Sequence, residues 1–425
     1  MTDRRQFLRR LGGLTGTAAL AELTGVRALF AADLGRSVSR IGPRRDAGAL
    51  ADEYLLGADV VYLNHASIGT IPRIVHQARQ RYLDLCETNP WLYMWHDAWE
   101  STRAEVRGKV AALLRCAPDE VAITHNTTEG FNTLAHGLPL GPGDEVLFST
   151  LNHPGASICW RHVGRRRGYS VKQFEFPIAD VPRMAAADVI ETYLRQIGPR
   201  TRVLAFSHID NTVGLRYPMR DLARAAKARG VEFVAVDGAQ SVGMIPVDLS
   251  DGAVDFYAAS PHKWLQAPKG LGLLYVSAAA RDRLDPMWVT WGQAQWKGTA
   301  RIYEDYGTRN LPELVTLGDA IDFQQRLGEA AKERRYREIW ERMRRAVEAH
   351  PRMAWRSPTD WALSSSLYAI EVKGVNSGDL FERLVRDHGM TFRAFGTPAF
   401  TSSRISPNLN TPMAHLDRWL DLAAG

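Results

Sequence analysis

The chain has 425 residues, of which 45% are hydrophobic and 24% charged, a composition typical of a globular protein with room for two domains. Its formal net charge is +6, and the first 32 residues contribute +3 of that, because five arginines there face one aspartate and one glutamate. The remaining +3 is too small to predict a nucleic-acid or membrane-surface partner, and the three cysteines (Cys86, Cys116 and Cys159) have no spacing that predicts a metal site or a disulfide framework.

Two arginine pairs, Arg4-Arg5 and Arg9-Arg10, precede a weakly apolar stretch over 11–21 that is rich in glycine and alanine. This order resembles a bacterial twin-arginine signal, whereas a basic amphipathic arm is the alternative. We therefore expect 1–32 to be recognised by the twin-arginine export machinery, with the protein periplasmic or otherwise extracytoplasmic. Cleavage near 19–21 and near 31–32 both remain open. The apolar stretch is too short for a membrane span, and no later segment reaches ~20 uninterrupted apolar residues.

Helical patterns and short apolar runs alternate through the first two thirds of the chain. Helices are expected over 73–86, 98–114 and 222–229, and Asn126-Thr127-Thr128 is a good helix opening. Strands are expected over 121–124, 145–149, 203–207, 233–237, 256–259 and 272–276. This alternation predicts an α/β fold with a mostly parallel, doubly wound sheet, in which ligands bind at the carboxyl ends of the strands.

The pattern changes after residue 320. A long helical stretch over 317–350 is followed by an alternating strand over 367–372 and by helices over 379–385 and 413–422. We therefore expect a large domain over 45–320 and a smaller α+β domain over 321–425. Trp91, Trp95 and Trp99 recur every four residues, which predicts one helical face that packs in the core or an interface, with a substrate pocket as the alternative.

Asp237 ends an apolar run, and Lys263 follows 26 residues later within Ser260-Pro261-His262-Lys263-Trp264. A lysine amine can form a Schiff base with the aldehyde of pyridoxal 5'-phosphate (PLP), and a carboxylate can keep the pyridine nitrogen protonated so that the ring accepts electrons. An aspartate and a lysine at this spacing would by themselves more simply predict a structural ion pair. The neighbouring residues are what favour the cofactor.

The neighbouring blocks occur in a specific order: Ser207-His208-Ile209-Asp210-Asn211, Val236-Asp237-Gly238-Ala239-Gln240, then His262-Lys263-Trp264-Leu265. Together they resemble the PLP-dependent fold type I enzymes (aspartate aminotransferase-like) of the class V aminotransferase family, over roughly 58–424. That family includes cysteine desulfurases and isopenicillin N epimerase. The resemblance implies a PLP-binding large domain and a smaller C-terminal domain.

The resemblance also implies roles around the cofactor. Lys263 matches the Schiff-base lysine and the proton shuttle at the substrate Cα, and Asp237 matches the partner of the pyridine nitrogen. His153 matches the ring stacked over the cofactor, while a loop histidine without that role is the alternative. Asn211 and Gln240 match positions near the cofactor's 3'-oxygen, with ordinary capping or turn roles as the alternative. Four further residues match positions around the cofactor's phosphate: Thr127, Thr128, Ser260 and His262.

On the substrate side, Arg404 matches the family arginine that binds the α-carboxylate, and Asn64 and His65 match a loop that closes on the substrate. Gly307-Thr308 resembles a motif that reaches the phosphate from the neighbouring subunit, with Gly298-Thr299 as a competing candidate. If Thr308 has this role, the active site is shared within a homodimer.

The chain also departs from the desulfurase pattern. All three cysteines lie before residue 160, Asn152-His153-Pro154 stands where desulfurases have adjacent histidines, and Met244 stands where many have another. The sequence is closer to the isopenicillin N epimerase-like branch. We expect a homodimeric enzyme that acts at the Cα of an amino acid or a derivative by transamination or epimerisation. A PLP-dependent C–S lyase acting on a cysteine conjugate is the alternative, and a non-catalytic binding protein of this fold is the alternative from another class.

Overall fold

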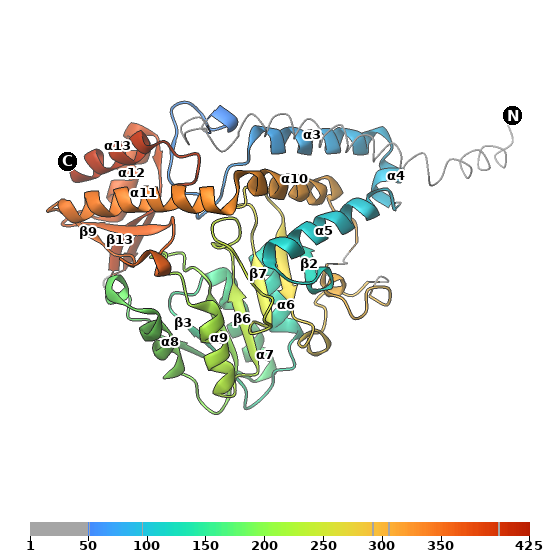
Figure 1. Cartoon of the computed structure of the whole chain (residues 1–425). Helices are drawn as coiled ribbons and strands as arrows, with labels where there is room; N and C mark the ends of the chain where they lie inside the picture. The colour runs from blue at the N-terminus through green and yellow to red at the C-terminus, as the bar shows by residue number, and fades with distance from the viewer. Residues whose placement is uncertain (1–49, 51, 96, 291–292, 305–306, 398–399) are drawn as a thin grey trace.

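A seven-stranded sheet forms the centre of the computed structural model (Figure 1). The structure describes residues 50, 52–95, 97–290, 293–304, 307–397 and 400–425. The strand order is β2-β8-β7-β6-β5-β3-β4. Only β8 runs against the others, because it pairs antiparallel with both β2 and β7, so the expected mostly parallel sheet is confirmed. The strands are β2 (Val121–Thr124), β3 (Glu145–Ser149), β4 (Ser170–Phe174), β5 (Thr201–Ser207), β6 (Phe233–Asp237), β7 (Phe256–Ala259) and β8 (Gly272–Val276).

Helices cover both faces of this sheet, because alternate strand residues point to opposite sides and both sides are apolar. Val121 and Ile123 pack in one core and Ala122, between them, packs in the other. The first core is completed by α5 (Glu100–Leu114), α8 (Ala186–Leu194), α9 (Met219–Ala228) and α10 (Leu311–Leu327). The second is completed by α6 (Thr127–Gly137) and α7 (Ile158–Arg167).

The C-terminal part has its own sheet and its own apolar core. The sheet is antiparallel, in the order β12 (Arg393–Thr397), β13 (Phe400–Ile405), β10 (Tyr368–Val372) and β9 (Met353–Trp355). Three helices pack with it: α11 (Glu329–Ala349), α12 (Ser377–His388) and α13 (Met413–Ala424). A strand from the start of the described chain, β1 (Val61–Tyr62), pairs in parallel with β11 (Met390–Thr391), so residues near 61 pack on the C-terminal part.

Two expectations were wrong. The helical stretch over 317–350 is two helices, α10 and α11, because Gly328 takes a φ of +78° that ends the first and begins the second. The three tryptophans do not share a helical face, because α4 (Pro90–Trp95) ends at Trp95 and Trp99 lies in a separate 3-10 turn. Trp99 is buried among α3 (Arg73–Thr88) and its neighbours, whereas Trp91 and Trp95 are 58% and 73% exposed.

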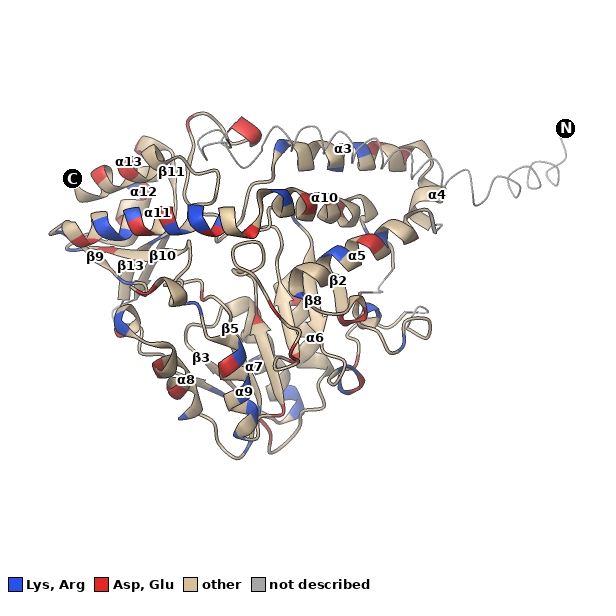
Figure 2. Cartoon of the chain, viewed as in Figure 1, with Lys and Arg blue, Asp and Glu red and all other residues tan. Residues whose placement is uncertain are grey.

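The expected boundary between the two domains, after residue 320, stays a prediction. Residue 320 lies inside α10, a helix that packs on α3 and α5. The twin-arginine segment lies outside the described residues. Within the described ranges, none of the helices combines the length and the apolarity needed to cross a membrane. Figure 2 shows basic and acidic residues interleaved along α11. They include exposed Arg–Glu pairs one turn apart, such as Arg337–Glu341 at 3.0 Å.

Candidate active site

Three predicted residues meet at the carboxyl edge of the parallel strands. Asp237 is the last residue of β6, Lys263 lies in the loop after β7, and His153 lies in the loop after β3. Asp237 is 5% exposed and accepts a hydrogen bond from the Ala239 N–H at 2.9 Å. Burial raises the pKa of the Asp237 carboxyl, while the charges of Lys263 and His153 oppose that rise, so the three groups lie close enough to interact.

Lys263 is partly buried, and its amine interacts with the charges of both Asp237 and Arg404. Burial lowers its pKa to about 8, against the opposing effect of Asp237 and with a further lowering by Arg404. A lysine in this condition has a substantial neutral fraction near neutral pH, which both nucleophilic attack and proton abstraction require.

Gly69 holds the N-terminal loop against the loop that carries Lys263. Its N–H donates to the His262 carbonyl at 2.9 Å, and a Cβ at this position would lie 2.2 Å from the Lys263 carbonyl oxygen. Only glycine allows this approach without a shift of the backbone. The predicted closing loop therefore touches the lysine loop directly.

Arg404, on β13, is 3% exposed and binds two distant segments, the loop with Asn64 and Ser67 and the turn with Asn211. It donates to the Asn211 carbonyl at 2.9 Å, to Asn64 Oδ1 at 2.8 Å and to Ser67 Oγ at 2.6 Å. Its Nε is buried without a hydrogen-bond partner, and burial lowers the pKa of the guanidinium to about 9, with Arg393 adding to that effect. An unpartnered N–H on a buried cation is suited to a carboxylate ligand.

The predicted phosphate end lies where α6 begins. The Thr127 N–H donates to Ser260 Oγ at 3.0 Å, and the two hydroxyls are 2.7 Å apart. Thr128 is exposed in the first turn, and Asn126 caps the helix by accepting from the Glu129 N–H at 2.8 Å. These hydroxyls and the positive end of the helix suit a phosphate.

Next to them, His262 Nδ1 is buried without a partner, and burial lowers the pKa of that ring to about 4. With Lys263 for the aldehyde, Asp237 for the ring nitrogen and this end for the phosphate, the side chains fit PLP.

Among the other predicted residues, Gln240, Asn211 and His153 form hydrogen bonds within the protein, whereas the His65 ring does not. Gln240 accepts from Trp264 Nε1 at 2.8 Å and donates from Nε2 to the Ala66 carbonyl at 2.9 Å, which leaves one Nε2 hydrogen for a ligand. Asn211 uses its carbonyl to hold Arg404. His65 is buried with both ring nitrogens unpartnered, beside the ring of Tyr62 at 4.9 Å between centroids. His153 Nδ1 accepts from the Gly155 N–H at 3.0 Å, and the residue is exposed, as a ring that covers a ligand would be before the ligand binds.

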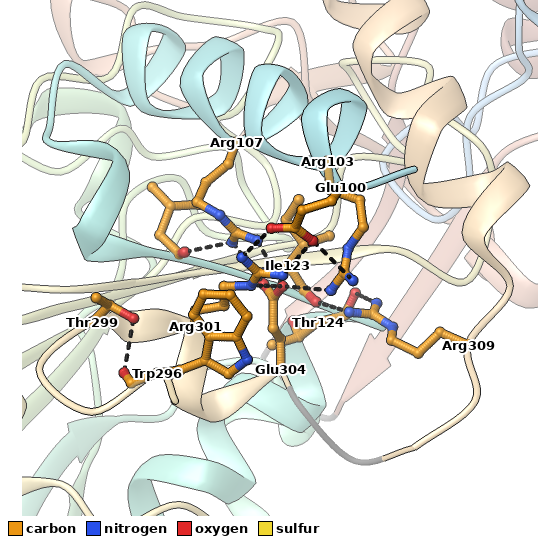
Figure 3. A network of polar contacts seen from close by, with 11 residues as sticks. Glu100, Arg103, Arg107, Ile123, Thr124, Trp296, Thr299, Arg301, Glu304 and Arg309 are labelled. Carbon is orange, nitrogen blue, oxygen red and sulfur yellow. Dashed lines mark hydrogen bonds and ion pairs between the residues drawn. The ribbon is translucent and has the colours of Figure 1, made fainter. Parts of the chain in front are cut away.

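Thr308 is exposed, unlike the predicted phosphate residues Thr127 and Ser260, which are buried. Four residues earlier, Glu304 lies in a buried ionic network in which Arg107 donates to its carboxylate at 2.7 and 2.8 Å (Figure 3). Arg309, next to Thr308, donates to the Ile123 carbonyl at 2.5 Å. Gly298-Thr299 is the competing candidate for the motif that reaches the phosphate. The Thr299 hydroxyl already donates to the Trp296 carbonyl at 2.9 Å.

Three residues of the site were missed. Asp210 accepts backbone N–H groups of Thr212, Val213 and Leu215 at 2.6 to 2.8 Å and shapes the turn that presents Asn211 to Arg404. Ser67 binds Arg404, and Arg393 faces Arg404 across β12 and β13. The Asp-Asn-Thr turn signal of Asp210 was readable in the sequence, whereas the strand pairing that brings in Arg393 was not.

The comparisons with known proteins agree with this geometry. The model of the family "Aminotransferase class-V" matches residues 61–403. Isopenicillin N epimerase from Streptomyces clavuligerus is 30% identical over 382 residues, which are 86% of this chain and 95% of that protein. A probable cysteine desulfurase from Methanothermobacter thermautotrophicus is 31% identical over 297 residues, 67% of this chain and 70% of that one.

A solved structure of the cystine C–S lyase C-DES, in complex with its reaction product cysteine persulfide, has the same fold. Its TM-score is 0.77 at 24% identity, over 86% of this chain and 98% of the other. The expected fold class is confirmed.

Proposed function

The chain belongs to the class V aminotransferase family, and from that membership we propose that it moves a proton at the Cα of an amino acid or an amino-acid-derived substrate, by epimerisation or transamination. Its cofactor is pyridoxal 5'-phosphate. One observation carries the proposal: a lysine with a lowered pKa lies near a buried aspartate and a buried arginine whose Nε has no partner.

The cofactor, when bound, supplies an electron sink for the carbanion at Cα. Lys263 holds it at the aldehyde, Asp237 holds the pyridine nitrogen in its protonated form, and Thr127, Thr128, Ser260 and His262 receive the phosphate. His153, open to solvent beside Asp237 and Lys263, covers the ring. Gln240 supplies its remaining Nε2 hydrogen near the 3'-oxygen, and Asn211 sets the loop beside it.

The substrate carboxylate binds Arg404, whose Nε–H is the unpartnered donor. Asn64 and Ser67 accept hydrogen bonds from the other side of the guanidinium and thereby fix its orientation. His65 packs behind that loop with its pKa lowered to about 3 by burial, so its ring stays neutral at physiological pH. With the carboxylate fixed, the Lys263 amine would take the proton from Cα. Epimerisation then requires a second proton donor on the opposite face of Cα, whereas transamination requires the proton to be delivered to the cofactor.

A C–S lyase is the second candidate, because cysteine desulfurases are among the relatives. The cysteines of this chain argue against a persulfide on the enzyme. Burial raises the pKa of Cys116 and Cys159 to about 12, and Cys86, on α3, is buried in the apolar cluster that contains Trp99. A lyase reaction here would therefore have to eliminate sulfur directly from the substrate.

The decisive experiment follows the Cα proton. The PLP-loaded protein is incubated with a panel of amino acids in deuterated water, and the products are resolved by mass and configuration. Deuterium at Cα with inverted configuration supports epimerisation, and an oxo acid formed only while an amino acceptor lasts supports transamination. Pyruvate with ammonia and a released thiol would replace the proposal by the lyase.

The variant Lys263→Ala should lose exchange and the absorbance of the bound cofactor. Lys227→Ala is the matched control, because Lys227 also pairs with an aspartate, Asp255, at 2.8 Å. Lys227 precedes β6 in the chain and Asp255 precedes β7, so this pair lies at the opposite edge of the sheet. An unchanged spectrum and unchanged exchange in Lys263→Ala would contradict the proposal.

We further propose a homodimer in which Thr308 reaches the phosphate of the partner's site. Its support is the exposure of Thr308 beside the anchored Arg309. Mixed dimers of Lys263→Ala and Thr308→Ala chains contain one complete site if Thr308 acts across the interface and none if it acts within its own chain. Activity regained on mixing is the expected result.

For the N-terminal segment we propose export by the twin-arginine route. Replacing Arg4 and Arg5 with lysine should retain the protein in the cytoplasm, and export that continues would contradict this.

A further inference from the structure

A cavity of about 210 Å³ lies apart from the candidate active site around Lys263. It is lined by the turn over 243–246, by the end of α10, by the first turns of α11 and by Trp361. Neither Lys263, Asp237 nor Arg404 lines it. An engineered cavity of about 150 Å³ holds benzene, so this one has room for a molecule of roughly amino-acid size.

Two under-partnered cations face this cavity. Lys332 is 9% exposed, and its Nζ donates to the neutral Gln324 Oε1 at 3.1 Å, with no carboxylate within ion-pair distance among the described residues. Arg216 is half-buried, and its guanidinium makes no hydrogen bond or ion pair in the part of the chain that the structure describes. Glu329 and Glu333 attract Lys332 and Arg216 respectively, but neither carboxylate lies within ion-pair distance of its cation among the described residues. Buried cations without a direct ion pair are costly, so both favour an anionic ligand.

The walls also carry negative charge, in a different place. Glu329 and Glu333 line the cavity, are solvent-exposed and lie in the first turns of α11. Glu333 Oε1 accepts from Trp361 Nε1 at 3.4 Å. The cavity therefore has the Lys332 cation in its buried part and the carboxylates of Glu329 and Glu333 in its exposed part. A zwitterionic ligand would place its negative group on the first and its positive group toward the second.

We propose that this cavity binds a free amino acid, with its carboxylate on Lys332 and Arg216 and its ammonium group toward Glu329 and Glu333.

The site connects to the catalytic loop by hydrogen bonds. Gln324, which accepts from Lys332, donates from Nε2 to Gln266 Oε1 at 2.8 Å, and Tyr54 OH donates to the same oxygen at 2.9 Å. Gln266 is fully buried, lies three residues after Lys263 and has a φ of +60°, a strained value for a residue other than glycine.

A second connection runs through aromatic packing. Tyr336, in the cavity wall, packs edge-to-face on Trp264 at 6.0 Å between centroids, and Trp264 binds Gln240. A carboxylate that draws Lys332 away from Gln324 changes the restraint on Gln266. Occupancy of the cavity therefore alters the position of the lysine loop.

The test uses the PLP-loaded Arg404→Gln variant, so that carboxylate binding at the first site is weakened and no turnover is needed. Isothermal titration is carried out with L-alanine, acetate and methylammonium. We expect L-alanine to bind at one site per chain, more tightly than either fragment. Acetate binding as tightly as L-alanine would overturn the zwitterion assignment.

Variants then locate the site. Lys332→Met should weaken L-alanine binding at least tenfold, and Ile245→Trp should do the same by filling the cavity, so the result does not depend on one variant folding. Arg334→Gln, an exposed neighbour that does not line the cavity, is the matched control. Binding that survives both Lys332→Met and Ile245→Trp, or no binding by the parent up to about 50 mM, overturns the proposal.

The coupling has its own readout, which is hydrogen–deuterium exchange of the amides over 261–270. L-Alanine should change this exchange in the Arg404→Gln parent and leave it unchanged when Lys332→Met is added. An identical change in the presence of Lys332→Met would show that the effect arises elsewhere.

Discussion

The substitution Glu304→Gln is expected to cost about 3 kcal/mol of the free energy of unfolding at neutral pH. Glu304 is 1% exposed, accepts from Arg107 at 2.7 and 2.8 Å and from the Ile123 N–H at 2.7 Å, and lies 3.5 Å from Arg103 (Figure 3). Burial alone would raise its pKa, but the arginines lower it from 4.5 to about 2. At about 1.4 kcal/mol for each tenfold change in acidity, that difference gives about 3 kcal/mol.

The sign of the pH dependence follows from the lowered pKa. The stabilisation is fully present above the unfolded value of 4.5 and is lost as the pH falls toward about 2, where the folded state also takes up the proton. Glutamine cannot ionise, so the variant should lack this part of the acid dependence.

The assay is urea unfolding of the holoenzyme followed by circular dichroism, at fixed protein and PLP concentrations because both shift apparent stability. Glu341→Gln on α11 is the control, since its pairs with Arg337 and Arg345, at 3.0 and 3.3 Å, are exposed and should contribute less than about 0.5 kcal/mol. A loss for Glu304→Gln no larger than that of Glu341→Gln would refute the reasoning, because the arginines would then be solvated.

Three further predictions concern the site. Cofactor uptake by the apoprotein should accelerate as the pH rises through about 8, since only the neutral Lys263 amine attacks the aldehyde. A stopped-flow rate of uptake that does not change with pH would contradict the lowered pKa of Lys263. Arg404→Lys should reduce kcat/KM by about 10- to 100-fold, mainly through KM, because a point charge replaces the planar donor; an unchanged KM in steady-state kinetics would place the carboxylate elsewhere. Gly69→Ala should cost about 1–3 kcal/mol and weaken PLP retention, since its Cβ would meet the Lys263 carbonyl, and dialysis without loss of cofactor would argue against that contact.

Much of the fold was predictable from the chain. The strands at 121–124, 145–149, 233–237, 256–259 and 272–276 have the predicted bounds because each is a short apolar run buried on both faces. In a parallel sheet such strands end at one edge, so Asp237, Lys263 and His153 could be brought together from sequence. Gly328 was readable as a helix end, but the helical pattern on both sides concealed it.

The rest depended on contacts between distant segments. Arg404 acquires its direction from Asn64, Ser67 and Asn211, which lie 193 to 340 residues away in the chain. The pairing of β1 with β11, the pairing that places Arg393 beside Arg404, and the cavity at Lys332 likewise arise only when the C-terminal part packs on the large sheet.

The sequence by itself therefore determined the sheet, the edge at which the chemistry occurs and the family, because strand period and local motifs are short-range properties. Only the tertiary structure decided how the substrate arginine is held, what Gln240 binds and where Lys332 lies, since these depend on which segments pack together. Buried polar groups must find partners across the whole chain, and no local pattern says which partners those are.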